Sequence, residues 1–109
     1  MAFQEKGNDT VSNGTTPVDV VPTPASAETH VVRNVVVFNA DTVLHNVTVQ
    51  VLSGANTRRV TRQVLNAGDT LNCEVVVNCD AVTKKVQVVL GEAHASVACE
   101  ITAAYGRSY

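Results

Sequence analysis

The chain has 109 residues, which is the size of one domain and too short for most enzymes with several sites. Its 8 Lys and Arg residues against 10 Asp and Glu residues give a formal net charge of −2. This balance argues against the basic field that binds nucleic acid or an anionic membrane surface, so we expect neither partner. The sequence contains 23 Val and 12 Thr, and these β-branched side chains favour strands over helices. We therefore expect an all-β protein.

Residues 1–29 differ in composition from the rest of the chain. Three prolines and two glycines fall among many Ser, Thr and Asn, so the segment cannot bury a core of its own. Each proline fixes φ and favours an extended conformation in the residue before it. The composition predicts an extended N-terminal arm over residues 1–29 and a β domain over residues 30–109. We expect the arm to contact a partner chain, with Phe3, Val18, Val20 and Val21 as its apolar contacts.

No stretch of the sequence has the apolar length of a signal peptide or of a membrane span. We therefore expect a protein made in the cytoplasm and not inserted in a membrane.

From residue 30 onward, six runs of alternating apolar and polar residues predict antiparallel strands. In chain order they are Val31–Asn39, Val43–Leu52, Thr57–Leu65, Thr70–Val77, Val82–Leu90 and Ala95–Ala104. Turn sequences rich in Asn, Asp and Gly separate them, for example Asn39-Ala-Asp-Thr42. The spacing predicts a small antiparallel β-sandwich or barrel of about six strands. A body of this size gains stability by forming oligomers.

The run Thr57–Leu65 carries three arginines. Strict alternation places Arg58 and Arg62 on one face of this strand and Arg59 on the other. Two interpretations stay open. The strand is either a sheet edge whose charges prevent aggregation, or an Arg-rich surface that contacts acidic groups of a neighbouring protein.

The sequence shows no pattern of catalytic or metal-binding residues. His45 is expected to face inward with a hydrogen-bond partner, and His94 is expected in an exposed loop. The short paired spacings of a zinc site are missing, as are a nucleophile elbow and a Gly-rich phosphate loop. We expect no metal, no cofactor and no enzymatic activity.

Three cysteines are an odd number, which excludes a disulfide framework that uses all of them. Cys73 and Cys99 fall at inward positions and are candidates for a pair inside the core. Cys73 and Cys79 are separated by about 20 Å of strand, too far for a disulfide. Cys79 is expected in a turn, where it is a candidate for a disulfide between subunits. The alternative is three free thiols.

Three segments together resemble a known family. Val35–Val51 contains an Asn-x-Asp-Thr turn before a Val-Thr-Val strand, and Leu65–Leu71 contains an Ala-Gly-Asp turn; the third segment is Val86–Ala93. These features are similar to the small β-sandwich virion proteins, of the head decoration type, of tailed double-stranded DNA bacteriophages.

The resemblance implies a virion structural protein that decorates or cements a capsid. Its partners would be the major capsid protein or other virion subunits, and it would form a homo-oligomer. One alternative is a neck or tail subunit of the phage particle. Another is a carbohydrate- or host-surface-binding module, although the shortage of aromatic side chains disfavours sugar binding.

Overall fold

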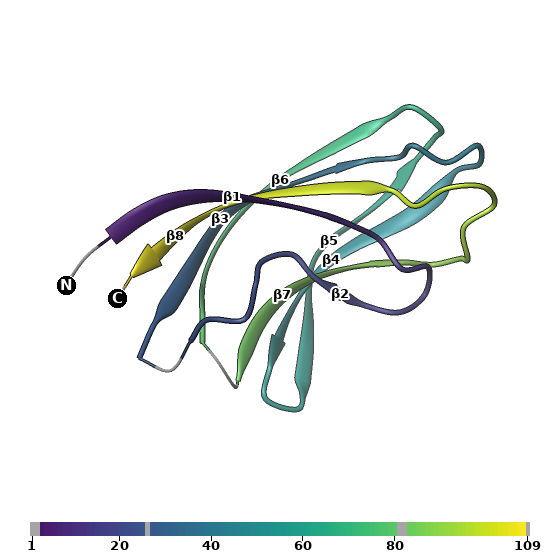
Figure 1. The fold of residues 1–109 in the computed structure, drawn as a ribbon. Helices are drawn as coiled ribbons and strands as arrows, with labels where there is room; N and C mark the ends of the chain where they lie inside the picture. The colour runs from purple at the N-terminus through teal and green to yellow at the C-terminus, as the bar shows by residue number, and fades with distance from the viewer. Residues whose placement is uncertain (1–2, 26, 81–82, 109) are drawn as a thin grey trace.

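The computed structural model describes residues 3–25, 27–80 and 83–108, and within these ranges it consists of strands and loops (Figure 1). The strands are β1 (Phe3–Val11), β2 (Val18–Asp19), β3 (Thr29–Phe38), β4 (His45–Ser53), β5 (Asn56–Leu65), β6 (Thr70–Cys79), β7 (Lys84–Leu90) and β8 (Glu100–Ser108). Among the described residues, no helix is long and apolar enough to cross a membrane.

The strands form two four-stranded antiparallel sheets that pack face to face. One sheet has the order β1-β8-β3-β6 and the other has the order β2-β7-β4-β5. Figure 1 shows the two sheets as separate layers, with β1, β8, β3 and β6 in one and β2, β7, β4 and β5 in the other. The predicted fold class, a small antiparallel β-sandwich, is confirmed.

The core lies between the two sheets and is built mainly from valine. Alternate residues of the central strands point inward, as the pleat of a strand requires. The fully buried members of the core include Val32, Val35, Val37, Val47, Val49, Val86, Val88 and Ile101. Their polar neighbours along each strand point to solvent, which explains the alternation in the sequence.

Five of the six predicted strands correspond closely to β3 through β7, although Val82, the predicted start of β7, lies outside the described residues. The sixth was predicted at Ala95–Ala104, but β8 begins only at Glu100. The residues before it form a loop, because their backbone N–H groups bind the buried carboxylate of Asp41 instead of a neighbouring strand.

The N-terminal segment is part of the sandwich, which corrects the predicted arm over residues 1–29. Strand β1 pairs with β8 along its whole length, from Phe3 opposite Ser108 to Val11 opposite Glu100. Val20 and Val21 are 0% and 7% exposed and belong to the core. The physical reason is that β1 covers the edge of β8 while the two valines fill space between the sheets. Residues 1, 2 and 26 of the predicted arm lie outside the described residues.

Candidate functional site

A network of buried polar side chains occupies the end of the sandwich where β3, β4, β7 and β8 are connected. It begins at Asn39, which directly follows β3 and is fully buried. The Asn39 side-chain amide donates hydrogen bonds to the backbone oxygens of Val43 and Leu65, both at 2.9 Å. Its Oδ1 accepts the N–H of Asp41 at 3.0 Å. One side chain therefore joins the β3–β4 connection to the end of β5.

Asp41 is the centre of this network. Its carboxylate accepts backbone N–H groups from Thr42 at 2.8 Å, Ala95 at 2.8 Å and Ser96 at 2.9 Å. The ring Nε2 of His45 lies 2.7 Å from Asp41 Oδ2. The Asp41 side chain thus fixes the loop between β7 and β8 against the loop between β3 and β4.

His45 lies between two carboxylates. Its Nδ1 is 3.0 Å from Oε1 of Glu92, on the opposite side of the ring from Asp41. Glu92 also accepts the backbone N–H of Asn46 at 2.9 Å and the Asn46 side-chain amide at 3.0 Å. Because both ring nitrogens face carboxylate oxygens, the geometry suits the doubly protonated imidazolium.

The electrostatics of the network agree with this assignment. Burial alone lowers the pKa of His45, but its hydrogen bonds to Asp41 and Glu92 outweigh burial, so its pKa is raised. The hydrogen bond from His45, followed by the Ala95 N–H, holds the pKa of Asp41 far below its usual range. Hydrogen bonds from Asn46 lower the pKa of Glu92. The two carboxylates therefore favour the protonated form of the His45 ring that lies between them.

Ser12 and His94 extend the network toward the N-terminal segment. Ser12 Oγ lies 2.7 Å from His94 Nε2 and accepts the backbone N–H of Cys99 at 2.9 Å. The N–H of Gly14 also donates to His94 Nε2, at 3.2 Å, so this ring nitrogen carries a lone pair and Ser12 donates its hydroxyl proton to it. The predicted loop position of His94 is confirmed, but its side chain is half-buried and holds the N-terminal segment in place.

The network performs a structural task, since its bonds join four separate chain segments. The sequence already predicted an inward, hydrogen-bonded His45, and this is confirmed. Asn39 and Asp41 were predicted only as turn formers, and Glu92 was not singled out. The available signal was their position shortly after strands: Asn39 directly follows β3, Asp41 comes two residues later, and Glu92 lies two residues after the end of β7.

The three arginines predicted as partner contacts lie on β5, which is an edge strand of its sheet and is exposed. Their predicted faces need a correction. Arg59 lies opposite Gln50 and Arg62 opposite Thr48, so both point to the outer face, whereas Arg58 lies opposite the inward residue Val51. A register shift at Val60 changes the alternation by one residue, and the sequence pattern does not show it.

The apolar contacts predicted for the arm lie mostly inside this chain. Val20 and Val21 are buried in the core, and Val18 is half-buried and paired with Val88 of β7. The predicted partner contact of Val20 and Val21 is therefore corrected, because the chain's own core already covers them. The contact predicted for Val18 stays a prediction, since Val18 lies on the edge strand β2. The backbone of Phe3 pairs with Ser108, and its side chain lies outside the described structure.

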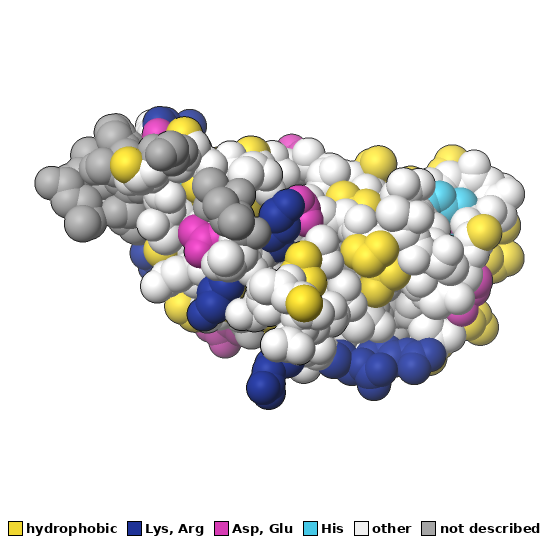
Figure 2. All heavy atoms as spheres, turned by 90° about the horizontal axis from the view of Figure 1, so that it is seen from below, with side chains coloured by type: hydrophobic (Ala, Val, Ile, Leu, Met, Phe, Trp, Pro, Cys, Tyr) yellow, Lys and Arg dark blue, Asp and Glu magenta, His cyan; other side chains and the backbone are white. Residues whose placement is uncertain are grey.

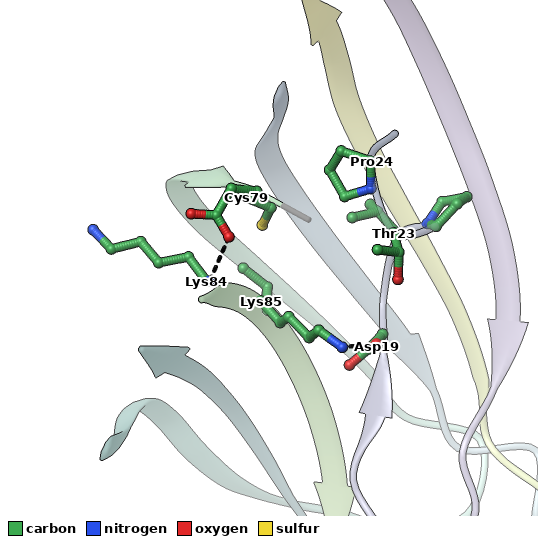
Figure 3. A pocket seen from close by; sticks show the side chains of 10 residues that line it. Asp19, Thr23, Pro24, Cys79, Lys84 and Lys85 are labelled. Carbon is green, nitrogen blue, oxygen red and sulfur yellow. Dashed lines mark hydrogen bonds and ion pairs between the residues drawn. The ribbon is translucent and has the colours of Figure 1, made fainter. Parts of the chain in front are cut away.

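Cys79 does not lie in a turn, as the sequence predicted, but at the end of β6, where it is 1% exposed. It borders a cavity of about 10 Å³, room for one water molecule at most (Figure 3). Burial raises the pKa of the Cys79 thiol, which lowers its reactivity. The predicted role in a disulfide between subunits is not compatible with this buried position.

Cys73 and Cys99 are both buried, as predicted, but all three cysteines are free. Cys73 lies on β6 and Cys99 directly precedes β8, and β3 separates these two strands. Two strand spacings amount to about 9–10 Å, which exceeds the reach of a disulfide, about 7 Å between Cα atoms. The predicted core pair is therefore not formed.

No protein-family model and no curated protein matches this sequence. Solved structures with similar folds do exist. A chain of infectious bursal disease virus, Gx strain, superimposes with a TM-score of 0.52 at 12% identity, over 97% of this chain and 31% of the viral chain. A chain from the T13 particle of the same virus gives 0.52 at 11% identity, over 96% and 30%. This chain thus spans less than a third of the length of these viral chains.

A third similar structure comes from Bacillus endospore appendages, described as a family of disulfide-linked pili. Its TM-score is 0.51 at 16% identity, over 97% of this chain and 84% of the pilus chain. At these identities the likeness concerns the fold alone. The fold and the buried network define the class of this protein, a small two-sheet β-sandwich whose loops are tied together at one end by buried polar groups.

Proposed function

We propose that this protein is a non-enzymatic structural subunit of a virus particle and, more specifically, that it decorates or cements a bacteriophage capsid. Two findings support the proposal. Its fold is similar to chains of virus particles over nearly its whole length. Its turn sequences resemble those of phage virion proteins. Its partners would then be the major capsid protein and further copies of itself.

The observation that carries the proposal is the surface of strand β5. This edge strand has ten residues, and all except Thr61 and Leu65 are exposed. Its outer face presents Arg59 and Arg62, and Val60 and Val64 are also exposed. Arginine beside apolar side chains is a composition typical of contact surfaces between proteins.

The number of copies in purified particles tests this function. Quantitative mass spectrometry of the particles would find hundreds of copies for a shell protein, and about six or twelve for a neck or tail subunit. Localisation at fibre tips would favour the host-surface-binding alternative. Absence of the chain from the particles would refute a virion role.

A second candidate function is the subunit of an extended appendage, and it is favoured by the share of the pilus chain that this chain matches. This chain matches 84% of the pilus subunit but less than a third of the viral chains. The buried cysteines argue against disulfide links between subunits. Electron microscopy with antibodies against this chain distinguishes the two candidates, because label follows either isometric particles or filaments.

A further inference from the structure

The outer faces of the two sheets carry opposite charge. On sheet β1-β8-β3-β6, the outward side chains include Glu5, Asp9, Glu74 and Glu100, and among the described residues Arg33 lies beside Glu5 on this face. On sheet β2-β7-β4-β5, Arg59, Arg62 and Lys85 point outward, with Asp19 as the acidic group. Figure 2 shows Lys and Arg side chains gathered along one margin of the molecule.

We propose that the basic face of one copy docks on the acidic face of the next copy, with Arg59 and Arg62 meeting Asp9 and Glu100. The occupant of each face is thus a second copy of this chain. Because the two faces differ, the contact is heterologous and can repeat from copy to copy, which produces a row or a ring of subunits.

The spacing of the charges supports this pairing. Arg59 and Arg62 lie opposite Gln50 and Thr48, two residues apart on β4, so the arginines are separated by about 7 Å. Asp9 lies opposite Thr102, two residues from Glu100 on the adjacent strand β8. Such diagonal neighbours are about 7–8 Å apart. Two guanidinium groups and two carboxylates therefore have matching separations.

Exposed apolar side chains flank both charged pairs. Val64 is 57% exposed and follows Arg62 on the outer face of β5. Val11 and Phe38 are 53% and 37% exposed and lie on either side of Glu100. Docking would remove these apolar groups from water and partly desolvate the ion pairs, and this strengthens contacts that are weak on an open surface.

The size of the faces is sufficient for a specific contact. The molecule measures 44 × 28 × 20 Å, and its shortest dimension corresponds to the thickness of two stacked sheets. A sheet face bounded by the two longer dimensions has a larger area than the roughly 800 Å² that each partner buries in a stable protein contact.

Sedimentation velocity of the purified full chain tests the proposal. Two double variants each disable one face: Arg59→Gln with Arg62→Gln, and Asp9→Asn with Glu100→Gln. All four side chains are exposed, so we expect the melting temperatures to stay close to that of the parent. Arg58→Gln is the matched control, because Arg58 is an exposed arginine of the same strand on its other face.

The parent should form oligomers that grow with concentration and dissociate as salt is raised. Each double variant alone should remain monomeric. Their equimolar mixture should give dimers and nothing larger, because one intact basic face meets one intact acidic face. The Arg58→Gln control should assemble like the parent. The single variant Arg62→Gln, which changes the basic face, should assemble less than the parent.

Any one of three results would overturn the inference. The first is assembly lost equally in Arg58→Gln and Arg62→Gln, and the second is a mixture of double variants that stays monomeric. The inference rests on the proposed function, but the two can fail separately. The third result, a parent chain that is monomeric at every concentration yet abundant in purified particles, refutes self-docking and leaves the virion role intact.

Discussion

Replacing Asn39 by alanine tests how much the buried network contributes to stability. The substitution removes two hydrogen bonds donated by the side-chain amide, to the backbone oxygens of Val43 and Leu65. It also removes the acceptor of the Asp41 N–H. Because the Asn39 side chain is fully buried, these three backbone groups would lose the partner that satisfies them inside the fold.

The magnitude follows from the number of orphaned groups. A buried donor or acceptor without a partner costs about 1–3 kcal/mol, so three of them cost about 3–5 kcal/mol if the structure relaxes in part. Domains of this size have a total stability of about 5–15 kcal/mol. With about 4 °C of melting temperature per kcal/mol, we expect a decrease of roughly 12–20 °C.

Urea unfolding followed by circular dichroism measures the change, with Asn72→Ala as the control. Asn72 is an exposed residue of β6, so its substitution should change the free energy of unfolding by less than about 0.5 kcal/mol. Asn39→Asp keeps the acceptor and loses both donated bonds, so it should also be strongly destabilising. A free energy of unfolding for Asn39→Ala within about 0.5 kcal/mol of the control would refute the reasoning.

Three further predictions follow from the described contacts. The raised pKa of His45 stabilises the fold fully below its unfolded value of 6.5, and this contribution is lost as the pH rises through the folded value. The lowered pKa values of Asp41 and Glu92 stabilise the fold above their ordinary values of 3.8 and 4.5, and this contribution is lost as the pH falls. The free energy of unfolding, measured with urea, should therefore be largest between pH 4.5 and 6.5. His45→Gln should abolish its decline at alkaline pH. The three buried thiols should resist a thiol reagent in the native chain and react in denaturant, and rapid native labelling of Cys79 would contradict its burial. Deleting residues 2–24 removes β1 and two core valines, whose burial contributes about 3–6 kcal/mol. The truncated chain should therefore lose its cooperative thermal transition. A sharp transition would instead support the prediction of a separate arm.

The sequence predicted most strands of the body well because buried and less buried residues alternate along them, with one interruption in β3 between Val32 and Asn34. In β7, for example, Val86, Val88 and Leu90 are buried and the residues between them are not. Local alternation is enough to predict such a strand, since each residue's environment depends only on its own parity.

The errors arose where long-range contacts decide the structure. Strand β1 has little alternation, and it forms because the edge of β8, at the other end of the described chain, offers hydrogen-bond partners. The loop from Ala95 to Val97 alternates like a strand, but its N–H groups bind Asp41. In β5, a single register shift at Val60 moved Arg59 to the face predicted for Arg58. None of these contacts has a local signature in the sequence.

The pairing of β1 with β8 also determines how the domain responds to mechanical force. Phe3 lies opposite Ser108, and both residues are at the same end of the sandwich (Figure 1). The hydrogen bonds between antiparallel strands run perpendicular to the strands. Tension between these two residues therefore loads the bonds one pair after another and peels β1 away at low force. Tension along the strand axes would instead load the whole row of bonds at once, so this seam resists pulling along the strands better than pulling its two ends apart.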